Sequence, residues 1–325
     1  MFRRLTALSM MLMMLTTLVP VPAGAQAGEY PQRPVTLIVT LPAGGPTDAA
    51  ARTLATALSQ TLGQPFVVEN RPGADGAIGA RAVVEAAPDG YTLLFSVGSL
   101  VALPHLQSPP PFDALRDLAP VAAIGSYPFA LFVHPSVPAA NVAEFIEYAR
   151  SRPEPLFYSA STPGEALAAT AFMQATGVPL TRVPYKGSSQ ALPDLLAGRV
   201  QLTFGPVATG LPHVREGLLN ALAVLTPKRL PALPDTATLE EAGIRGVTVP
   251  SWQAMLAPAG TPPAILDQLA SATAAALETA PVRERLTKLL LQIELLPPAA
   301  LAQRIEADDA LWQRHFAATA AARQP

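Results

Sequence analysis

Residues 33–52 read RPVTLIVTLPAGGPTDAAAR, which predicts a strand, a glycine-containing turn and a helix in direct succession. The apolar run Val35–Leu41 is typical of a buried strand, and Pro46 suits the first position of a helix because that position needs no amide hydrogen. Gly44 and Gly45 let the backbone approach a ligand closely. The unpaired N–H groups of the first helical turn would therefore offer an anion site above the end of the strand.

Short apolar runs alternate with helical patterns along most of the chain. This alternation predicts an α/β fold with two parallel-rich sheets flanked by helices. The predicted strands are Val35–Thr40, Phe66–Glu69, Thr92–Ser96, Val121–Ile124, Ala130–His134, Leu156–Ser159, Thr181–Val183, Leu202–Phe204, Ala221–Leu225 and Gln253–Ala257. The predicted helices are Asp48–Thr61, Ile78–Ala86, Val142–Arg150, Ala166–Thr176, Ser189–Ala197, Pro262–Glu278, Val282–Leu290 and Pro298–Ala320.

The N-terminus, residues 1–27, has the pattern of a secretory signal peptide. Arg3 and Arg4 precede the apolar run Leu5–Val19, and small residues follow at a suitable cleavage distance. A membrane anchor is the alternative, but this run is shorter than the roughly 20 residues that a span needs. A secreted chain with Cys 0 carries no disulfide and no lipidated cysteine, so we expect a bacterial periplasmic protein.

The chain after the signal peptide is too long for one simple core, so two domains are expected. Residues 125–128 and 226–234 have the composition of crossings between domains. We therefore predict a discontinuous first domain of residues 28–126 and 230–325, and an inserted second domain of residues 127–229. A cleft would then lie between the two lobes.

The composition argues against several classes of function. A net charge of -2 with 14% charged residues gives no basis for binding nucleic acid or a membrane surface. The four histidines lack metal-ligand spacing, and no nucleophile–base motif is present, so we expect no metal, no cofactor and no enzyme activity. A periplasmic hydrolase that uses Asp48 or Lys186 as acid or base is the alternative from another class.

Small polar residues follow several predicted strands, where parallel strands would bring them to one cleft. They fall in four clusters: 42–48, 96–99, 159–164 and 185–189. Hydroxyls and free amides at such strand-to-helix junctions can donate to a ligand oxygen. Two alternatives stay open: Asp48 could be an ordinary first-turn carboxylate, and Lys186 a solvated surface lysine.

Motifs along the whole mature chain resemble the Bug family, the extracytoplasmic substrate-binding proteins of tripartite tricarboxylate transporters. The matching motifs are YPxRP from Tyr30, PAGGPTD from Pro42, ENRPG from Glu69, PDGYTLL from Pro88, VPYKG from Val183 and LAPAGTP from Leu256. The resemblance implies a two-domain periplasmic binding protein, similar to type II, with a ligand cleft between its lobes. It would close over a small carboxylate, held by backbone amides, small hydroxyls and bound waters. It selects as ligand-binding residues Pro42, Gly44, Gly45, Thr47, Asp48, Ser96, Ser99, Ser159, Ser161, Thr162, Tyr185 and Lys186.

Two departures from the family pattern lie at the expected pocket. Gly205-Pro206 stands where the family commonly has Asp-Asn, so Gly205 joins the predicted ligand-binding residues. The segment Tyr158–Phe172 is shorter than usual and lacks a histidine before its helix, with Ala166 nearest to that position. Both changes bear on ligand specificity.

The function that these features predict is solute capture in the periplasm. Hinge closure would trap a small carboxylate-bearing metabolite, and the closed form would deliver it to the integral-membrane subunits of a tripartite tricarboxylate transporter. We expect a monomer. A ligand-sensing receptor for a membrane signalling protein is the alternative that the sequence leaves open.

Overall fold

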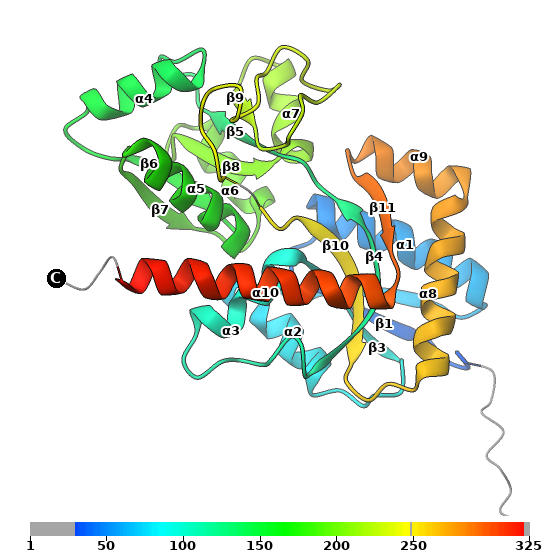
Figure 1. The fold of residues 1–325 in the computed structure, drawn as a ribbon. Helices are drawn as coiled ribbons and strands as arrows, with labels where there is room; N and C mark the ends of the chain where they lie inside the picture. Colours follow the sequence, from blue (N-terminus) through cyan, green and yellow to red (C-terminus); the bar gives the residue numbers. More distant parts are fainter. Residues whose placement is uncertain (1–29, 248, 322–325) are drawn as a thin grey trace, which may run out of the picture.

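The computed structural model describes residues 30–247 and 249–321, so the predicted signal peptide lies outside the described residues. The chain forms two sheets with helices on both faces of each (Figure 1). We call the six-stranded sheet with its helices the first lobe, and the five-stranded sheet with its helices the second lobe. This two-lobe α/β architecture confirms the predicted fold class.

The sheet of the first lobe has the strand order β11-β4-β10-β3-β1-β2. Strand β1 pairs in parallel with β2 and β3, whereas β10 is antiparallel to β3 and β4, and β11 is antiparallel to β4. The sheet is therefore mixed, because β4 and β10 run in opposite directions as the chain leaves this lobe and returns to it. The strands are β1 Val35–Val39, β2 Phe66–Asn70, β3 Thr92–Val97, β4 Leu118–Ser126, β10 Trp252–Pro258 and β11 Gln292–Leu296.

The sheet of the second lobe has the order β7-β6-β8-β5-β9 and is also mixed. Strand β6 is parallel to β7 and β8, and β5 is antiparallel to β8 and β9. The strands are β5 Phe129–Val133, β6 Leu156–Ala160, β7 Leu180–Pro184, β8 Leu202–Pro206 and β9 Asn220–Val224.

Helices bury both faces of each sheet. In β1, Val35, Leu37 and Val39 face α1, α8 and α9, while Ile38 joins α2 and α10 on the opposite face, as the two-residue period of a strand requires. The helices of the first lobe are α1 Pro46–Leu62, η1 Ala74–Gly76, α2 Ala77–Val84, η2 Gly98–Ala102, α3 Leu103–Leu106, α8 Pro263–Glu278, α9 Ala280–Lys288 and α10 Pro298–Ala321. Those of the second lobe are α4 Val142–Ser151, α5 Pro163–Thr176, α6 Ser188–Leu196 and α7 Val207–Arg215.

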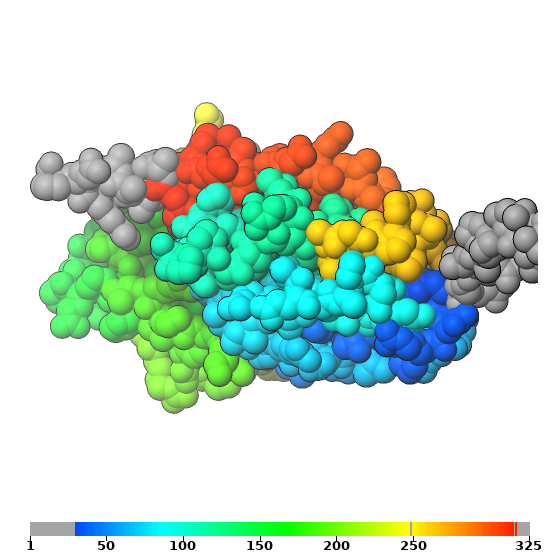
Figure 2. Space-filling view, turned by 90° about the horizontal axis from the view of Figure 1, so that it is seen from below, coloured from blue at the N-terminus to red at the C-terminus, as the bar shows by residue number. Residues whose placement is uncertain are grey.

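Two crossings join the lobes and lie side by side. The first runs from β4 into β5, and the second enters β10; Tyr127 N–H donates to the Ser251 carbonyl at 3.3 Å between them. Figure 2 shows the result from below, with the green second lobe beside a first lobe built from both ends of the chain.

The loop between β9 and β10 packs mostly on the second lobe. Leu230, Leu233, Leu239 and Val247 belong to its two hydrophobic clusters. We therefore propose that the second domain boundary lies at residues 249–251, later than the position predicted from prolines between 226 and 234. The first boundary, at residue 126, stays a prediction that agrees with the end of β4.

The structure contains strand β11 and helix α7, which were not among the predicted strands and helices. Helix α7 contains Gly210 and Pro212, which usually break helices. Gly210 is required here, since a β-carbon at that position would lie 2.5 Å from the Phe132 ring. Among the described residues, no helix has both the length and the apolar character needed to cross a bilayer.

Candidate functional site

The first turns of four helical segments point into the space between the lobes. In the first lobe these are α1, after Gly45, and the short segment η2; in the second lobe they are α5, after Thr162, and α6, after Gly187. Gly45 and Gly187 cap their helices without a side-chain hydrogen bond. Because first-turn N–H groups have no partner inside a helix, these ends are free to bind a ligand oxygen.

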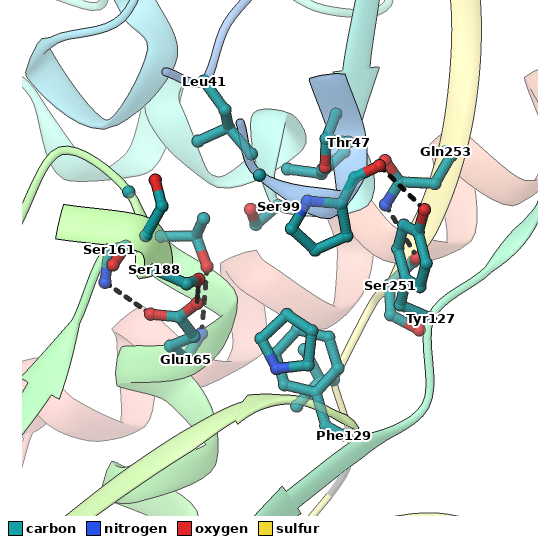
Figure 3. A pocket seen from close by; sticks show the side chains of 18 of the residues that line it. Leu41, Thr47, Ser99, Tyr127, Phe129, Ser161, Glu165, Ser188, Ser251 and Gln253 are labelled. Carbon is teal, nitrogen blue, oxygen red and sulfur yellow. Dashed lines mark hydrogen bonds between the residues drawn. The ribbon is translucent and has the colours of Figure 1, made fainter. Parts of the chain in front are cut away.

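These helix starts line one pocket between the lobes. Figure 3 shows Leu41, Thr47 and Ser99 on one side of the cavity, and Ser161, Glu165 and Ser188 on the other. The crossings supply the remaining wall with Tyr127, Phe129, Val249, Pro250, Ser251 and Gln253.

Several contacts hold the lobes together around this cavity. Arg182 on β7 lies 3.4 Å from the Asp75 carboxylate of the first lobe. The Tyr127 hydroxyl donates to the Pro46 carbonyl at 2.8 Å, which ties the first crossing to the start of α1. The described structure is therefore one in which the two lobes are in contact.

Among the described residues that line the cavity, two side chains are ionisable, Glu165 and Tyr127, and neither carries a positive charge. Burial raises the pKa of Glu165 to about 7. The N–H of Ser161, the hydroxyl of Ser188 and the charge of Arg182 lower this pKa, but burial outweighs them. Burial also raises the pKa of the Tyr127 phenol. No arginine or lysine clamp is available in this wall for a ligand carboxylate.

Two buried polar atoms in the wall have no hydrogen-bond partner. They are the Ser161 hydroxyl and the Gln253 Oε1; each residue is 2% exposed. Leaving a buried polar atom unpaired costs about 1–3 kcal/mol, so such atoms call for a bound partner. Their position in the cavity suits a polar ligand or a water that bridges to one.

Six of the predicted ligand-binding residues line this cavity together. They come from both lobes, as the sequence patterns predicted: Pro42, Gly45, Thr47, Ser99, Ser161 and Thr162. Three others lie beside it. Ser159 and Gly205 line a second pocket that shares Ser161, Ser188 and Pro206 with the first, and Gly44 lines an open groove next to Gly45.

Asp48 does not line the cavity but shapes the loop in front of it. Its Oδ2 accepts the Gly44 N–H at 3.0 Å and its Oδ1 accepts the Asn70 amide at 2.9 Å. Burial opposes ionisation, but hydrogen bonds from Arg52, Gly44 and Asn70 outweigh it and lower the pKa of Asp48. The carboxylate thus holds Gly44 in its left-handed conformation, with φ +84°.

Ser96, Tyr185 and Lys186 also lie outside the cavity wall. The Ser96 hydroxyl shares a hydrogen bond of 2.9 Å with Thr40, and the Tyr185 hydroxyl donates to Asp194 at 2.5 Å. Lys186 is exposed. A ligand role for these three residues, as for the whole predicted set, stays a prediction.

Several residues of the wall were not among the selected ligand-binding residues. In the predicted cluster 185–189, Gly187, Ser188 and Ser189 line the cavity where α6 begins, whereas the selected Tyr185 and Lys186 do not. Glu165 could have been found from the Thr162-x-x-Glu165 pattern, the sequence signature of a capping box. The Thr162 hydroxyl accepts the Glu165 N–H at the start of α5, while the Glu165 carboxylate accepts the N–H of Ser161, one residue before the N-cap. The residues of the crossings carry no sequence motif, and only the pairing of β4 with β10 brings them to the site.

Within residues 30–247 and 249–321, no group of His, Asp and Glu side chains could hold a metal ion.

Comparison with known proteins agrees with the fold. Residues 50–309 match the family described as tripartite tricarboxylate transporter family receptor. Protein BugT of Bordetella pertussis (strain Tohama I) is 38% identical over 248 residues, which cover 75% of this chain and 76% of BugT.

Solved structures resemble the whole two-lobe architecture. The periplasmic binding protein BugD superimposes with a TM-score of 0.82 and 34% identity, covering 88% of this chain and 97% of BugD. A protein of R. palustris solved with adipate has a TM-score of 0.84 and 37% identity, covering 90% of this chain and 98% of that protein. This family consists of receptors, not enzymes. The chain belongs to the tripartite tricarboxylate transporter receptor family, as its Bug-like motifs predicted.

Proposed function

We propose that this protein is a periplasmic receptor that captures a small organic acid and delivers it to the membrane subunits of a tripartite tricarboxylate transporter. One observation carries the proposal: the N-terminal turns of α1, α5 and α6 come from both lobes and line a single cavity. Unpaired N–H groups at helix starts favour anionic oxygen atoms. An enclosed cavity with a few polar groups and apolar walls is also the usual form of a metabolite site.

The cavity can hold a carboxylate without a basic side chain. A hydrogen bond between a neutral donor and a charged acceptor contributes about 1.5–3 kcal/mol. Several such contacts would give micromolar binding, which corresponds to about 8 kcal/mol. The adipate bound to the R. palustris protein supports a dicarboxylate of similar size as the ligand class.

Hinge closure is the proposed capture step. The lobes are joined by the two crossings at Tyr127 and Ser251, which lie side by side and can act as one hinge. Rotation about them would separate α1 and η2 from α5 and α6 and open the cavity to solvent. The ligand would favour the closed form because only that form brings donors from both lobes onto it.

The experiment that tests this proposal is a thermal-shift screen of the mature protein, residues 28–325, with straight-chain mono- and dicarboxylates of three to eight carbons. We expect at least one acid to raise the melting temperature in a concentration-dependent way, because a ligand that binds only the folded state stabilises it. Isotherms should give one site per chain, and size-exclusion chromatography should give the predicted monomer. If no acid in a broad panel binds, the proposal is wrong.

A further inference from the structure

Glu165 lies in the cavity wall, and Figure 3 shows its carboxyl group next to Ser161 and Ser188. The residue is 2% exposed. One carboxyl oxygen, Oε2, accepts the main-chain N–H of Ser161, and the other, Oε1, lies 3.2 Å from the Ser188 hydroxyl. Glutamates that cap a helix through a capping box usually face solvent, so complete burial beside a ligand cavity points to a further role.

Few charged groups face Glu165 from the elements packed around it. Arg182 on β7 is the cation that acts on it, and the Asp75 carboxylate pairs with that guanidinium from the first lobe. Strand β6 supplies Tyr158, whose pKa is raised by burial, while η2 and β8 supply no ionisable side chain. On α6, Asp194 is engaged with Tyr185 and Arg199.

A carboxylate ligand in this cavity would meet a second carboxyl group and no cation in the wall. Two like charges at close range in a low-dielectric site repel strongly, and one of them takes up a proton instead. We propose that capture of an anionic ligand is coupled to uptake of one proton from solvent by Glu165, whose neutral carboxyl group then donates a hydrogen bond to a ligand oxygen. This inference rests on the proposed function.

The hydrogen-bond pattern assigns the proton to one oxygen. Oε2 faces the main-chain N–H of Ser161, which can only donate, so Oε2 must remain an acceptor. The proton is therefore carried by Oε1. There it can point to the ligand, while the Ser188 hydroxyl is free to donate to the same ligand or to a bound water.

The pKa of Glu165 lies in the range in which ligand binding can drive proton uptake. With a pKa of about 7, the carboxyl group is partly ionised near neutral pH, so a ligand can change its protonation state. An anionic ligand would raise this pKa further. The other possibility is a ligand that carries an ammonium group and pairs with an ionised Glu165; the pH dependence of binding then has the opposite sign.

The test is the dissociation constant of adipate, measured by calorimetry from pH 6.5 to 8.5, where adipate itself stays ionised. If Glu165 stays protonated in the complex, proton-coupled binding predicts that Kd rises roughly 20-fold over this range. At pH 8, calorimetry in buffers of different ionisation enthalpy should show uptake of about 0.9 proton per ligand. If adipate does not bind, the first dicarboxylate that raises the melting temperature replaces it.

Glu165→Gln separates proton coupling from a capping role. The glutamine amide has the shape of the protonated acid, with one acceptor for Ser161 N–H and one donor for the ligand. We expect the variant to bind at pH 8.5 with the affinity that the wild type has at pH 6.5, and to show no pH dependence. Asp308→Asn is the matched control: burial also raises the pKa of Asp308, but this residue bonds Trp252 outside the cavity, so the pH dependence should persist.

A second variant keeps the test decisive if Glu165→Gln does not fold. Ser188→Ala removes a donor that stabilises the ionised carboxylate, so the midpoint of the pH profile should move to higher pH. Three results would overturn the inference while leaving acid capture intact. They are a wild-type Kd that is independent of pH, a pH dependence of Kd that persists in Glu165→Gln, and tighter binding at higher pH. If no acid binds to the wild type or to Glu165→Gln at any pH, the proposed function fails, and the inference fails with it.

Discussion

Gly187 of the second lobe faces Pro42 of the first lobe so closely that a β-carbon on Gly187 would lie 2.6 Å from Pro42 Cδ. The backbone of Gly187 is extended, with φ -172°, so any residue could adopt its conformation. The glycine is therefore needed here for space and not for backbone freedom. Contact between the lobes at the mouth of the cavity depends on this missing side chain.

Gly187→Ala should weaken ligand binding without unfolding the protein. The added methyl group would hold the lobes apart by its contact with Pro42, and donors from both helix starts could no longer reach one ligand. We expect Kd for the captured acid to rise at least about tenfold, which corresponds to about 1.4 kcal/mol. Gln190→Ala, at an exposed position on α6, is the control and should bind like the wild type. Equal affinities in both variants would contradict closure at this contact.

Gly45→Val should place a branched side chain in the cavity. A β-carbon on Gly45 meets only the Pro42 carbonyl oxygen, at 3.8 Å, so the protein itself can accept it. Valine is a poor N-cap, and we expect a loss of about 1 kcal/mol in the free energy of unfolding. Binding should fall by at least about 30-fold, about 2 kcal/mol. Isothermal titration and thermal melts distinguish the two effects, and an unchanged Kd would remove this loop from the site.

Ser161→Ala should weaken ligand binding without lowering the free energy of unfolding. The Ser161 hydroxyl is buried and has no hydrogen-bond partner among the described protein groups, so its removal should leave the free energy of unfolding unchanged or raise it slightly. Ligand binding should weaken by about 1–2 kcal/mol if the hydroxyl bonds the ligand. Urea denaturation and calorimetry on the same preparation provide the two numbers. A variant that loses stability and keeps its affinity would show that the hydroxyl serves the fold instead.

Asp48→Asn should destabilise the glycine loop in a pH-dependent manner. The folded-state pKa of Asp48 lies below its ordinary value of 3.8, so the ionised group stabilises the protein above about pH 4, and this contribution is lost as the pH falls through the folded pKa. We expect the variant to lose about 1–2 kcal/mol of stability at pH 7. Denaturation at pH 7 and at pH 3 should show that the difference from the wild type shrinks in acid. A difference of equal size at both values would exclude the charge as its cause.

Glu165→Gln should remove a stability cost that grows with pH. The folded-state pKa of Glu165, about 7, lies above the ordinary value of 4.5, so the wild type becomes less stable relative to the variant as the pH rises through this window. The relative change between pH 4.5 and pH 8 should approach about 3 kcal/mol. Urea denaturation of both proteins at the two pH values provides the measurement. If the two stability curves run parallel, the carboxyl group is not buried as the structure places it.

Local patterns were sufficient to predict most of the secondary structure. The run Val35–Val39 has the nearly continuous apolar pattern of a strand buried on both faces, and Pro46 and Gly63 mark the two ends of α1. Helix α7 escaped prediction because Gly210 and Pro212 are helix breakers by themselves. Its stability comes from packing on Phe132, a residue that is distant in the sequence.

The sequence by itself determined the two-lobe class, the helix starts after glycines and hydroxyl residues, and the small polar character of the ligand site. These features depend on neighbours along the chain, where the chemistry of each residue acts directly. Only the tertiary structure decided that Gln253 and Tyr127 reach the cavity, that Ser96 and Lys186 do not line it, and that a buried glutamate lies within it. Those outcomes follow from strand pairing and from the contact between the lobes, which join residues far apart in sequence and control which side chains lose their water.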